Sequence, residues 1–249
     1  MQIAKWSFNP GLAPTLACLL VFPLLLGLGF WQLDRADQKQ AILDEYIAKT
    51  VLEPVDLNVE ILSGHTDENT LWRRGVIRGR YTNDRTFMLD NQVVKGMVGY
   101  FVYSPFEIEG SKIRVIINRG WVPAGEHREV VPQIAQTTDL ITLTGLVTDY
   151  PPPPGILMGD RDQNLQQMAP DISRMQIING KLLEEMLDYD LFPYVIRLDP
   201  SAPAGFVREW SAPESGKEKH LGYAVQWFAL AAALVVIYIS VNLRRREAK

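Results

Sequence analysis

Two long apolar runs, residues 11–33 and 221–243, lie near the two ends of the chain. Neither run contains Asp, Glu, Lys, Arg or His. At a rise of 1.5 Å per residue, a helix of this length covers about 34 Å, which exceeds the roughly 30 Å hydrocarbon core of a bilayer. The first run could instead be a secretory signal peptide, but it is longer than such a segment and no small-x-small cleavage site follows it. We therefore expect two transmembrane helices, residues 11–33 and 220–243.

The positions of basic residues predict how these helices are oriented. Arg244, Arg245 and Arg246 follow the second run directly, and Lys5 precedes the first. Because basic residues concentrate on the cytoplasmic side of membrane spans, we expect cytoplasmic tails at residues 1–10 and 244–249. Residues 34–219 would then form one domain outside the cytoplasm, and about 185 residues are enough to bury a core.

Within residues 34–219 the pattern changes to period two, with β-branched and aromatic residues and short polar turns between the apolar stretches. This pattern predicts strands at residues 73–81, 86–89, 98–106, 113–118, 140–147, 194–198 and 206–210. Helical spacing predicts a short helix at 37–49 and another at 179–188, with Asn179 as its N-cap. We expect a membrane protein of the α plus β class, in which two spans flank a mainly antiparallel, barrel-like α+β domain. The proline-rich residues 148–170 would be a long excursion from this sheet.

Charge and cysteine content restrict the chemistry of the exterior domain. The chain has a net charge of −4, and five basic residues against Glu247 give the two tails +4, so the exterior part carries about −8. A nucleic acid or an anionic lipid surface is therefore an unsuitable partner for it. The only cysteine, Cys18, lies in the first apolar run, so the exterior domain has neither a disulfide nor a thiolate metal ligand.

Polar and aromatic residues gather where each predicted span reaches the outer face. Trp31 and Gln32 end the first span, and Gln226 and Trp227 lie at a comparable depth in the second, so the two glutamines could pair. His220 begins the second span, with Tyr223 and Trp227 on its side of the helix. An interfacial histidine can be merely the last polar residue before lipid, but an imidazole beside aromatic rings also suits haem ligation.

Two further stretches are candidates for binding a partner. Arg119 and Trp121, in the segment NRGWVP, are either a strand end that packs on the core or a surface pair of the type found at interface hot spots. Arg35 follows the first span, where it could extend to lipid headgroups or contact a partner. The chain contains no G-x-S-x-G, glycine-rich phosphate loop or H-E-x-x-H sequence, so we expect no enzymatic activity.

Four segments occur in an order that is more specific than any one of them. FWQLDRADQK follows the first span, GYFVYSPF and NRGWVP lie in the exterior domain, and HLGYAVQWF opens the second span. This combination resembles the surfeit-locus family of cytochrome c oxidase assembly proteins over nearly the whole chain. The resemblance implies a role in assembly of the haem-containing oxidase subunit and binding of haem a through a histidine at the second span, which here is His220.

We therefore expect a non-enzymatic factor that binds haem a transiently and assists its delivery to the haem-containing subunit of cytochrome c oxidase. His220, Tyr223, Gln226, Trp227, Trp31 and Gln32 would form the haem site, while Arg119, Trp121 and Arg35 would contact the partner protein. Haem a synthase is a further candidate partner. The expected location is the bacterial inner membrane, with both termini cytoplasmic and the main domain periplasmic. The alternative is a membrane-anchored scaffold that stabilises the oxidase subunit without binding haem.

Overall fold

The computed structural model describes residues 6–64, 69–82, 84–125, 130–135, 137–153 and 165–245. The chain divides into two compact units. One unit contains both ends of the sequence, residues 1–46 and 212–249, and the other contains residues 47–211. The first is referred to below as the helical unit and the second as the sheet unit.

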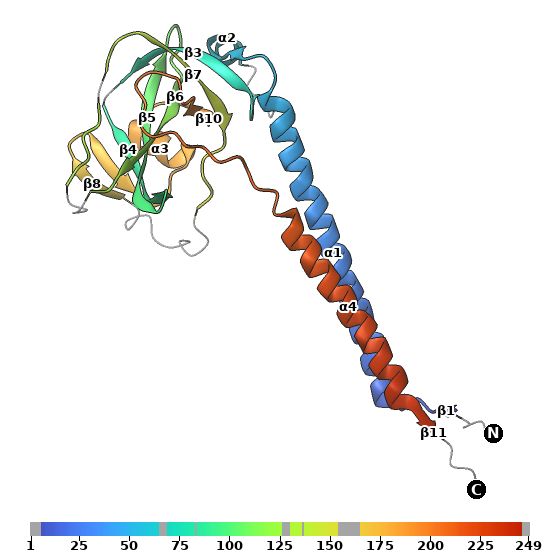
Figure 1. Ribbon diagram of the computed structural model, residues 1–249. Helices are drawn as coiled ribbons and strands as arrows, with labels where there is room; N and C mark the ends of the chain where they lie inside the picture. Colours follow the sequence, from blue (N-terminus) through green and yellow to red (C-terminus); the bar gives the residue numbers. More distant parts are fainter. Residues whose placement is uncertain are drawn as a thin grey trace. The chain divides into compact units, whose positions relative to one another are not determined.

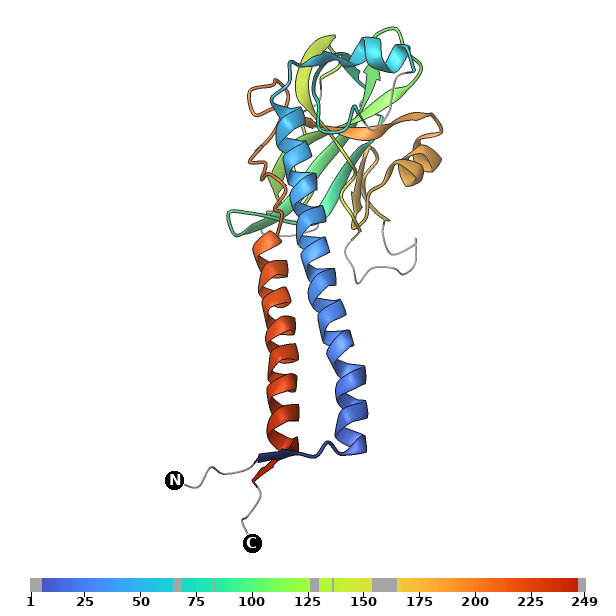
Figure 2. The same ribbon diagram turned by 90° about the vertical axis from the view of Figure 1, so that its right-hand side faces the viewer.

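Two helices, α1 (Leu12–Thr50) and α4 (Lys217–Asn242), make up most of the helical unit and lie side by side (Figures 1 and 2). Both are long and apolar enough to cross a membrane, which agrees with the predicted spans. The helix predicted at 37–49, as an outward continuation of the first span, is the last part of α1, which is a single helix of 39 residues. Pro23 lies inside this helix without ending it.

The two ends of the chain are joined at one end of the helix pair. Short strands β1 (Trp6–Phe8) and β11 (Leu243–Arg245) pair in antiparallel fashion. Next to them the Asn242 side chain accepts a hydrogen bond from the Gly11 N–H at 3.0 Å. One turn further along, the Thr15 and Tyr238 hydroxyls lie 2.9 Å apart. Because these contacts hold both termini together, the two helices run in opposite directions (Figure 1).

The described residues of the sheet unit form nine strands in one sheet and two short helices. The strands are β2 (Val55–Asp56), β3 (Arg74–Tyr81), β4 (Thr86–Val94), β5 (Met97–Ile108), β6 (Arg114–Pro123), β7 (Ile141–Thr148), β8 (Leu165–Ala169), β9 (Ile172–Met175) and β10 (Leu191–Leu198), and the helices are α2 (Leu57–Leu62) and α3 (Gly180–Leu187). Their order in the sheet is β2-β3-β7-β10-β6-β5-β4-β9-β8. A further pairing between β3 and β5 closes five of the strands, β3, β7, β10, β6 and β5, into a barrel. The predicted α+β class with a barrel-like sheet is confirmed.

The barrel encloses one apolar core, to which every one of its strands contributes buried side chains such as Ile77, Phe106, Ile117, Leu143 and Ile196. Helix α2 adds Leu57 and Ile61 to this core. Its N-terminus is capped by the Asp56 carboxylate, which accepts hydrogen bonds from two backbone N–H groups. Leu57 packs so closely on β3 that a side chain at Gly75 would meet it at 2.5 Å. Glycine at this position therefore allows the helix to pack against the barrel.

A second core lies on the outer face of the barrel sheet. Helix α3 contributes Leu183 to it, and strands β4, β6 and β10 contribute residues such as Phe87, Ile116 and Val195. The predicted helix and cap are confirmed, since α3 begins after Asn179, whose side chain accepts a hydrogen bond from the Leu182 N–H at 2.9 Å. Successive side chains of β10 therefore point into different cores, with Ile196 inside the barrel and Val195 outside it.

Three predictions about strands are wrong in detail. β6 does not end at Asn118 but continues to Pro123, so NRGWVP is part of a strand. Residues 206–210 do not form a strand and make a single bridge, between Val207 and Trp121. Part of the predicted excursion 148–170 belongs to the sheet as β8, whose pairing with β9 carries it there, while residues 154–164 of that excursion are outside the described residues. The cause is the same in each case, because the partner segment in the sheet decides where a ladder begins and ends.

Candidate functional site

Small residues allow α1 and α4 to approach closely at the end of the pair that begins α4. Gly29, Gln32 and Ala36 are the buried residues of α1, and Ala224 and Ala231 are buried on α4. A side chain at Gly29 would meet the Phe228 ring at 2.6 Å. Close backbone approach through glycine and alanine is a common way for membrane helices to associate. These five positions form the interface line of the helix pair.

Gln32 and His220 meet on this line. The Gln32 side chain is only 9% exposed, and its Oε1 lies 2.7 Å from His220 Nδ1. A carbonyl oxygen can only accept a hydrogen bond, so Nδ1 carries the proton and donates it to Gln32. In the neutral ring the other nitrogen, Nε2, then keeps its lone pair. The pair therefore presents an imidazole in the tautomer that can bind a metal ion through Nε2.

The expected pairing of Gln32 with Gln226 is wrong. The Gln226 side chain is exposed, whereas Gln32 has His220 as its partner. Six residues separate His220 from Gln226, which places them about 120° apart around an ideal helix. Gln226 therefore lies away from the interface line, and we do not include it in the candidate site.

The predicted aromatic residues share one side of the helix pair. On α1, Phe30 and Trp31 lie on opposite sides of the interface line, and on α4 so do Phe228 and the pair Tyr223 and Trp227. Phe30 and Phe228 contact each other with ring centroids 5.3 Å apart, so they occupy the same side of the pair. It follows that Tyr223 and Trp227 face the other side. Trp31 lies toward that side too, but an ideal helix places it about 130° from the α1 interface line, at the outer edge of the side. Trp31 is 51% exposed and Tyr223 is 41% exposed, so this side, referred to below as the aromatic side, is open.

Arg35 lies on α1 one turn after Trp31. Its guanidinium is 6.0 Å from the centre of the Trp31 ring, and it donates a hydrogen bond to the Gln38 side chain at 2.9 Å. The side chain is exposed. It therefore remains available for the partner contact that we expect of it, which the structure leaves as a prediction.

Arg119 is buried in the sheet unit. Its side chain is 1% exposed and donates hydrogen bonds to the carbonyl oxygens of Ala204 at 2.9 Å and Ala135 at 2.6 Å. The guanidinium also stacks on the rings of Tyr81, at 4.6 Å, and Phe206, at 4.9 Å. Burial lowers the pKa of the Arg119 guanidinium, and Tyr81 opposes that change. Burial likewise raises the pKa of Tyr81 to about 12, against the effect of the Arg119 and Arg208 cations.

Trp121 is also buried, with 3% of its surface exposed. Its indole N–H donates a hydrogen bond to the carbonyl oxygen of Gln92 at 3.0 Å. Its backbone N–H donates to the Val207 carbonyl oxygen, and its carbonyl oxygen accepts from the Val207 N–H. The interpretation of Arg119 and Trp121 as a surface for a partner is therefore wrong. NRGWVP is instead a stretch of β6 that forms hydrogen bonds with residues 204–207. This agrees with the other interpretation, in which Arg119 and Trp121 pack on the core.

Arg119 is buried because β6 contains a β-bulge at this residue. Opposite Tyr103 and Val102 of β5, strand β6 places Asn118 and Gly120, so Arg119 is an extra residue in the ladder. Gly120 has a φ of +114°, and a side chain there would meet the carbonyl oxygen of Val207 at 2.6 Å. The bulge turns Arg119 toward Tyr81 of the barrel core, and only glycine fits after it.

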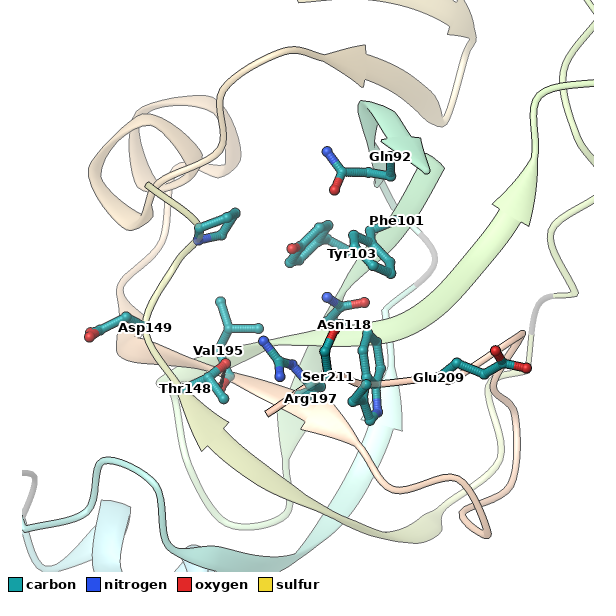
Figure 3. Close-up of a pocket in the computed structure, with 12 residues that line it drawn as sticks. Gln92, Phe101, Tyr103, Asn118, Thr148, Asp149, Val195, Arg197, Glu209 and Ser211 are labelled. Atoms are coloured by element: carbon teal, nitrogen blue, oxygen red, sulfur yellow. Dashed lines mark hydrogen bonds between the residues drawn. The ribbon is translucent and has the colours of Figure 1, made fainter. Parts of the chain in front are cut away.

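A pocket of about 180 Å³ lies on the outer face of the barrel sheet (Figure 3). Phe101, Tyr103 and Trp210 supply aromatic walls, and Asn118 and Arg197 supply polar groups. Asp149 and Glu209 lie at opposite edges of this pocket in Figure 3, and Glu209 forms an ion pair with Lys95 at 2.5 Å. The Thr148 hydroxyl donates to the Val195 carbonyl oxygen at 3.4 Å. The pocket is therefore lined by a mixture of aromatic and polar groups.

The remaining potential metal ligands do not form a second site in the part of the chain that is described. His65 and His127 are outside the described residues. Across the described ranges, no group of three or more His, Cys, Asp or Glu side chains could hold a metal ion. His220, with its Nδ1 occupied by Gln32, is thus the best-placed single ligand on the described part of the chain.

Comparison with known proteins identifies the family. The sequence model of the SURF1 family matches residues 19–232, which include the complete sheet unit and a large part of each of the two helices. The chain belongs to the SURF1 family. The SURF1-like protein of Rickettsia bellii is 26% identical over 235 residues, covering 90% of this chain and 88% of the relative. Surfeit locus protein 1 of Takifugu rubripes is 22% identical over 243 residues, covering 91% of this chain and 96% of the relative. The resemblance seen in the ordered segments is therefore confirmed.

For this SURF1-family chain, the sequence missed one relationship at the candidate site, which is that Gln32 and His220 are partners. A signal for it was present. Gln32 lies one residue before the end of the first predicted span, and His220 begins the second, so two antiparallel spans place both residues at the same depth. What periodicity could not provide was the rotation of each helix about its own axis.

Proposed function

We propose that this protein is a non-enzymatic assembly factor for cytochrome c oxidase, which binds haem a transiently and assists its delivery to the haem-containing oxidase subunit. Membership of the SURF1 family supports the role in oxidase assembly, because the ordered segments of this chain resemble the surfeit-locus family of cytochrome c oxidase assembly proteins. The observation that carries the haem proposal is the His220–Gln32 pair, which leaves Nε2 of a neutral imidazole as a ligand atom.

The residues around His220 fit a haem. The ring is large, planar and apolar, and the aromatic side of the helix pair offers Tyr223 and Trp227 for contact with it, with Trp31 at the outer edge. Haem iron accepts an axial imidazole, and this is the one bond that the chain itself would supply through His220. The aromatic side is open rather than closed, which suits a ligand that must be passed on.

The strength of binding is also consistent with transfer. A permanent cytochrome usually holds its iron through two strong axial ligands. Within the described residues of the helical unit, His220 is the only histidine, and Cys18 lies far along α1 from it. A single imidazole can hold the haem and still release it to the oxidase subunit.

We place the protein in the bacterial inner membrane, with both termini cytoplasmic and residues 34–219 in the periplasm. The two apolar helices and the joined chain ends support two spans with both termini on one side. The arginines after the second span support the cytoplasm as that side. The oxidase subunit and haem a synthase are the proposed partners, and both would meet the site at the outer face of the membrane.

The scaffold alternative, which stabilises the oxidase subunit without haem, has lost its expected contact surface, because Arg119 and Trp121 are buried. Only Arg35 remains exposed among the residues assigned to a partner. The helical unit therefore supports a haem carrier better than a scaffold. The experiment described next distinguishes these two functions.

The test is to purify the His220→Asn variant of the full chain from membranes of a host that makes haem a. Asparagine keeps a polar side chain that can pair with Gln32 but cannot act as a strong axial ligand. We expect the variant to accumulate normally and to lose most of its Soret absorbance relative to the unaltered protein. His65→Asn and His127→Asn are the matched controls and should keep it. Retention of full Soret absorbance by His220→Asn would refute His220 as the ligand. Absence of Soret absorbance from the unaltered protein, purified from the same host, would favour the scaffold.

A further inference from the structure

A histidine ligand has a requirement that the residue type alone does not meet. A neutral imidazole carries its proton on either Nδ1 or Nε2, and only the unprotonated nitrogen can bind a metal. A surface histidine exchanges between the two forms and between ring orientations. A reliable Nε2 ligand therefore needs an acceptor that holds the proton on Nδ1.

We infer that Gln32 is a positioning residue for His220, whose side-chain carbonyl fixes the imidazole as the Nδ1–H tautomer and directs its Nε2 lone pair outward as the ligand. The inference rests on the proposed haem-binding function. It assigns to Gln32 a role different from contact with the haem, because the distance of 2.7 Å between its Oε1 and His220 Nδ1 commits its carbonyl to the histidine.

The acceptor is itself fixed in place. Gln32 is 9% exposed, and on the same face of α1 it is followed by Ala36, which is fully buried. On its other side along the helix, Gly29 lies against the Phe228 ring of α4. A buried amide next to lipid must be hydrogen-bonded, so breaking its bond to the imidazole is unfavourable. The interface line therefore holds the amide, and the amide holds the imidazole.

The choice of an amide over a carboxylate also has a consequence. Histidine ligands often donate their second N–H to a carboxylate, which raises the basicity of the ligand. A neutral carbonyl selects the same tautomer with a smaller increase in basicity, and it avoids placing a charge at the membrane edge. Gln32 thus orients the ligand and keeps its bond to iron weak enough to be reversed.

The experiment uses the full chain in detergent, labelled with ¹⁵N-histidine and free of haem, so that its first readout is independent of haem. Ring ¹⁵N shifts report which nitrogen carries the proton, and the His220 signals are those that disappear in His220→Asn. Gln32→Leu removes the acceptor, and Gln32→Glu restores an acceptor on a stem of the same length. Gln226→Leu is the matched control, because it makes the same change at the exposed glutamine. The second readout is the dissociation constant for added haem a.

We expect His220 to be the Nδ1–H tautomer in the unaltered protein, in Gln32→Glu and in Gln226→Leu, and to shift toward Nε2–H in Gln32→Leu. We expect Gln32→Leu to bind haem a on the order of 10-fold more weakly, as is usual when the partner of a ligating histidine is removed. Gln226→Leu should bind it as the unaltered protein does. If Gln32→Leu does not accumulate, Gln32→Met makes the same test with an unbranched side chain.

An unchanged His220 tautomer in Gln32→Leu would overturn the inference, whatever happens to haem. A changed tautomer together with undiminished haem binding by His220→Asn would support the positioning role and refute His220 as the ligand. The two proposals therefore fail in distinguishable ways.

Discussion

Arg119 shows how a charged side chain can be stable inside the sheet unit. Its two carbonyl acceptors come from residues 135 and 204, and the faces of its guanidinium are covered by Tyr81 and Phe206. An arginine supplies a flat, delocalised cation that can stack and donate in several directions at once, which a lysine cannot. Because the charge is desolvated, its stability depends on keeping all of these contacts.

Arg119→Lys should therefore destabilise the protein although it preserves the charge. We expect a loss of about 2–4 kcal/mol in the free energy of unfolding, since a buried cation would lose partners and stacking. Urea unfolding of the sheet unit in the full chain, followed by tryptophan fluorescence, measures this. Arg80→Lys is the matched control at an exposed position of β3 and should change stability by less than about 0.5 kcal/mol. Equal effects of the two substitutions would contradict the structural role given to Arg119.

Helices α1 and α4 are held together by shape as well as by polar contacts. At one end the Thr15–Tyr238 and Gly11–Asn242 hydrogen bonds join them, and at the other end the Gln32–His220 bond does so. Between apolar helices in a bilayer the hydrophobic effect contributes little to association, so close packing at small residues matters more. Gly29 is one position where this packing is tight, because a side chain there would meet the Phe228 ring at 2.6 Å.

Gly29→Leu should separate the two helices near His220. The new side chain would begin 2.6 Å from the Phe228 ring, and the displacement should break the 2.7 Å bond between Gln32 and His220. We expect the His220 ring ¹⁵N signals to change as they do in Gln32→Leu, with a similar loss of haem a. Gly27→Leu, in the same helix at an exposed position with open space around it, should leave these signals unchanged. If both leucine variants behaved like the unaltered protein, close packing at Gly29 would not be what holds the pair.

The way the chain returns on itself has consequences for its topology. The first and last described segments pair as β1 and β11, so both ends of the helical unit must lie on the same side of a membrane that α1 and α4 cross (Figure 1). The segment between the helices is then on the opposite side. Arginines at the second end favour the cytoplasm for the termini, so the haem proposal needs residues 34–219 to be periplasmic.

Reporter fusions at Gly64 and at the C-terminus test this arrangement. We expect alkaline phosphatase activity from the Gly64 fusion and activity of a cytoplasmic reporter from the C-terminal fusion. Gly64 is exposed, and space is open around its α-carbon, so an insertion there should be tolerated. If the two fusions showed that Gly64 and the C-terminus lie in the same compartment, the arrangement with two spans would be ruled out. His220 would then not be assigned to the outer face of the membrane.

Much of the architecture could be read directly from the pattern of residues. Both spans were predicted from length and apolarity, because a helix of about twenty consecutive apolar residues can cross lipid with its backbone hydrogen bonds satisfied internally. Helix α3 and its Asn179 cap were predicted because capping and helical spacing are local. Most of the barrel strands were located by period two, and the ordered segments indicated the family, which the match over residues 19–232 confirmed.

The sequence alone therefore determined which stretches form the two long apolar helices, where most of the barrel strands lie, and where His220 lies along α4. The tertiary structure decided what each side chain meets. Gln32 and His220 are 188 residues apart, and their contact depends on the rotation of two helices about their axes. Arg119 is buried because a bulge in β6 turns it inward, and the barrel closes because β3 pairs with β5. Periodicity shows that a helix or strand has a buried face, but partners are chosen by the packing of elements that are far apart in the chain, which no local pattern encodes.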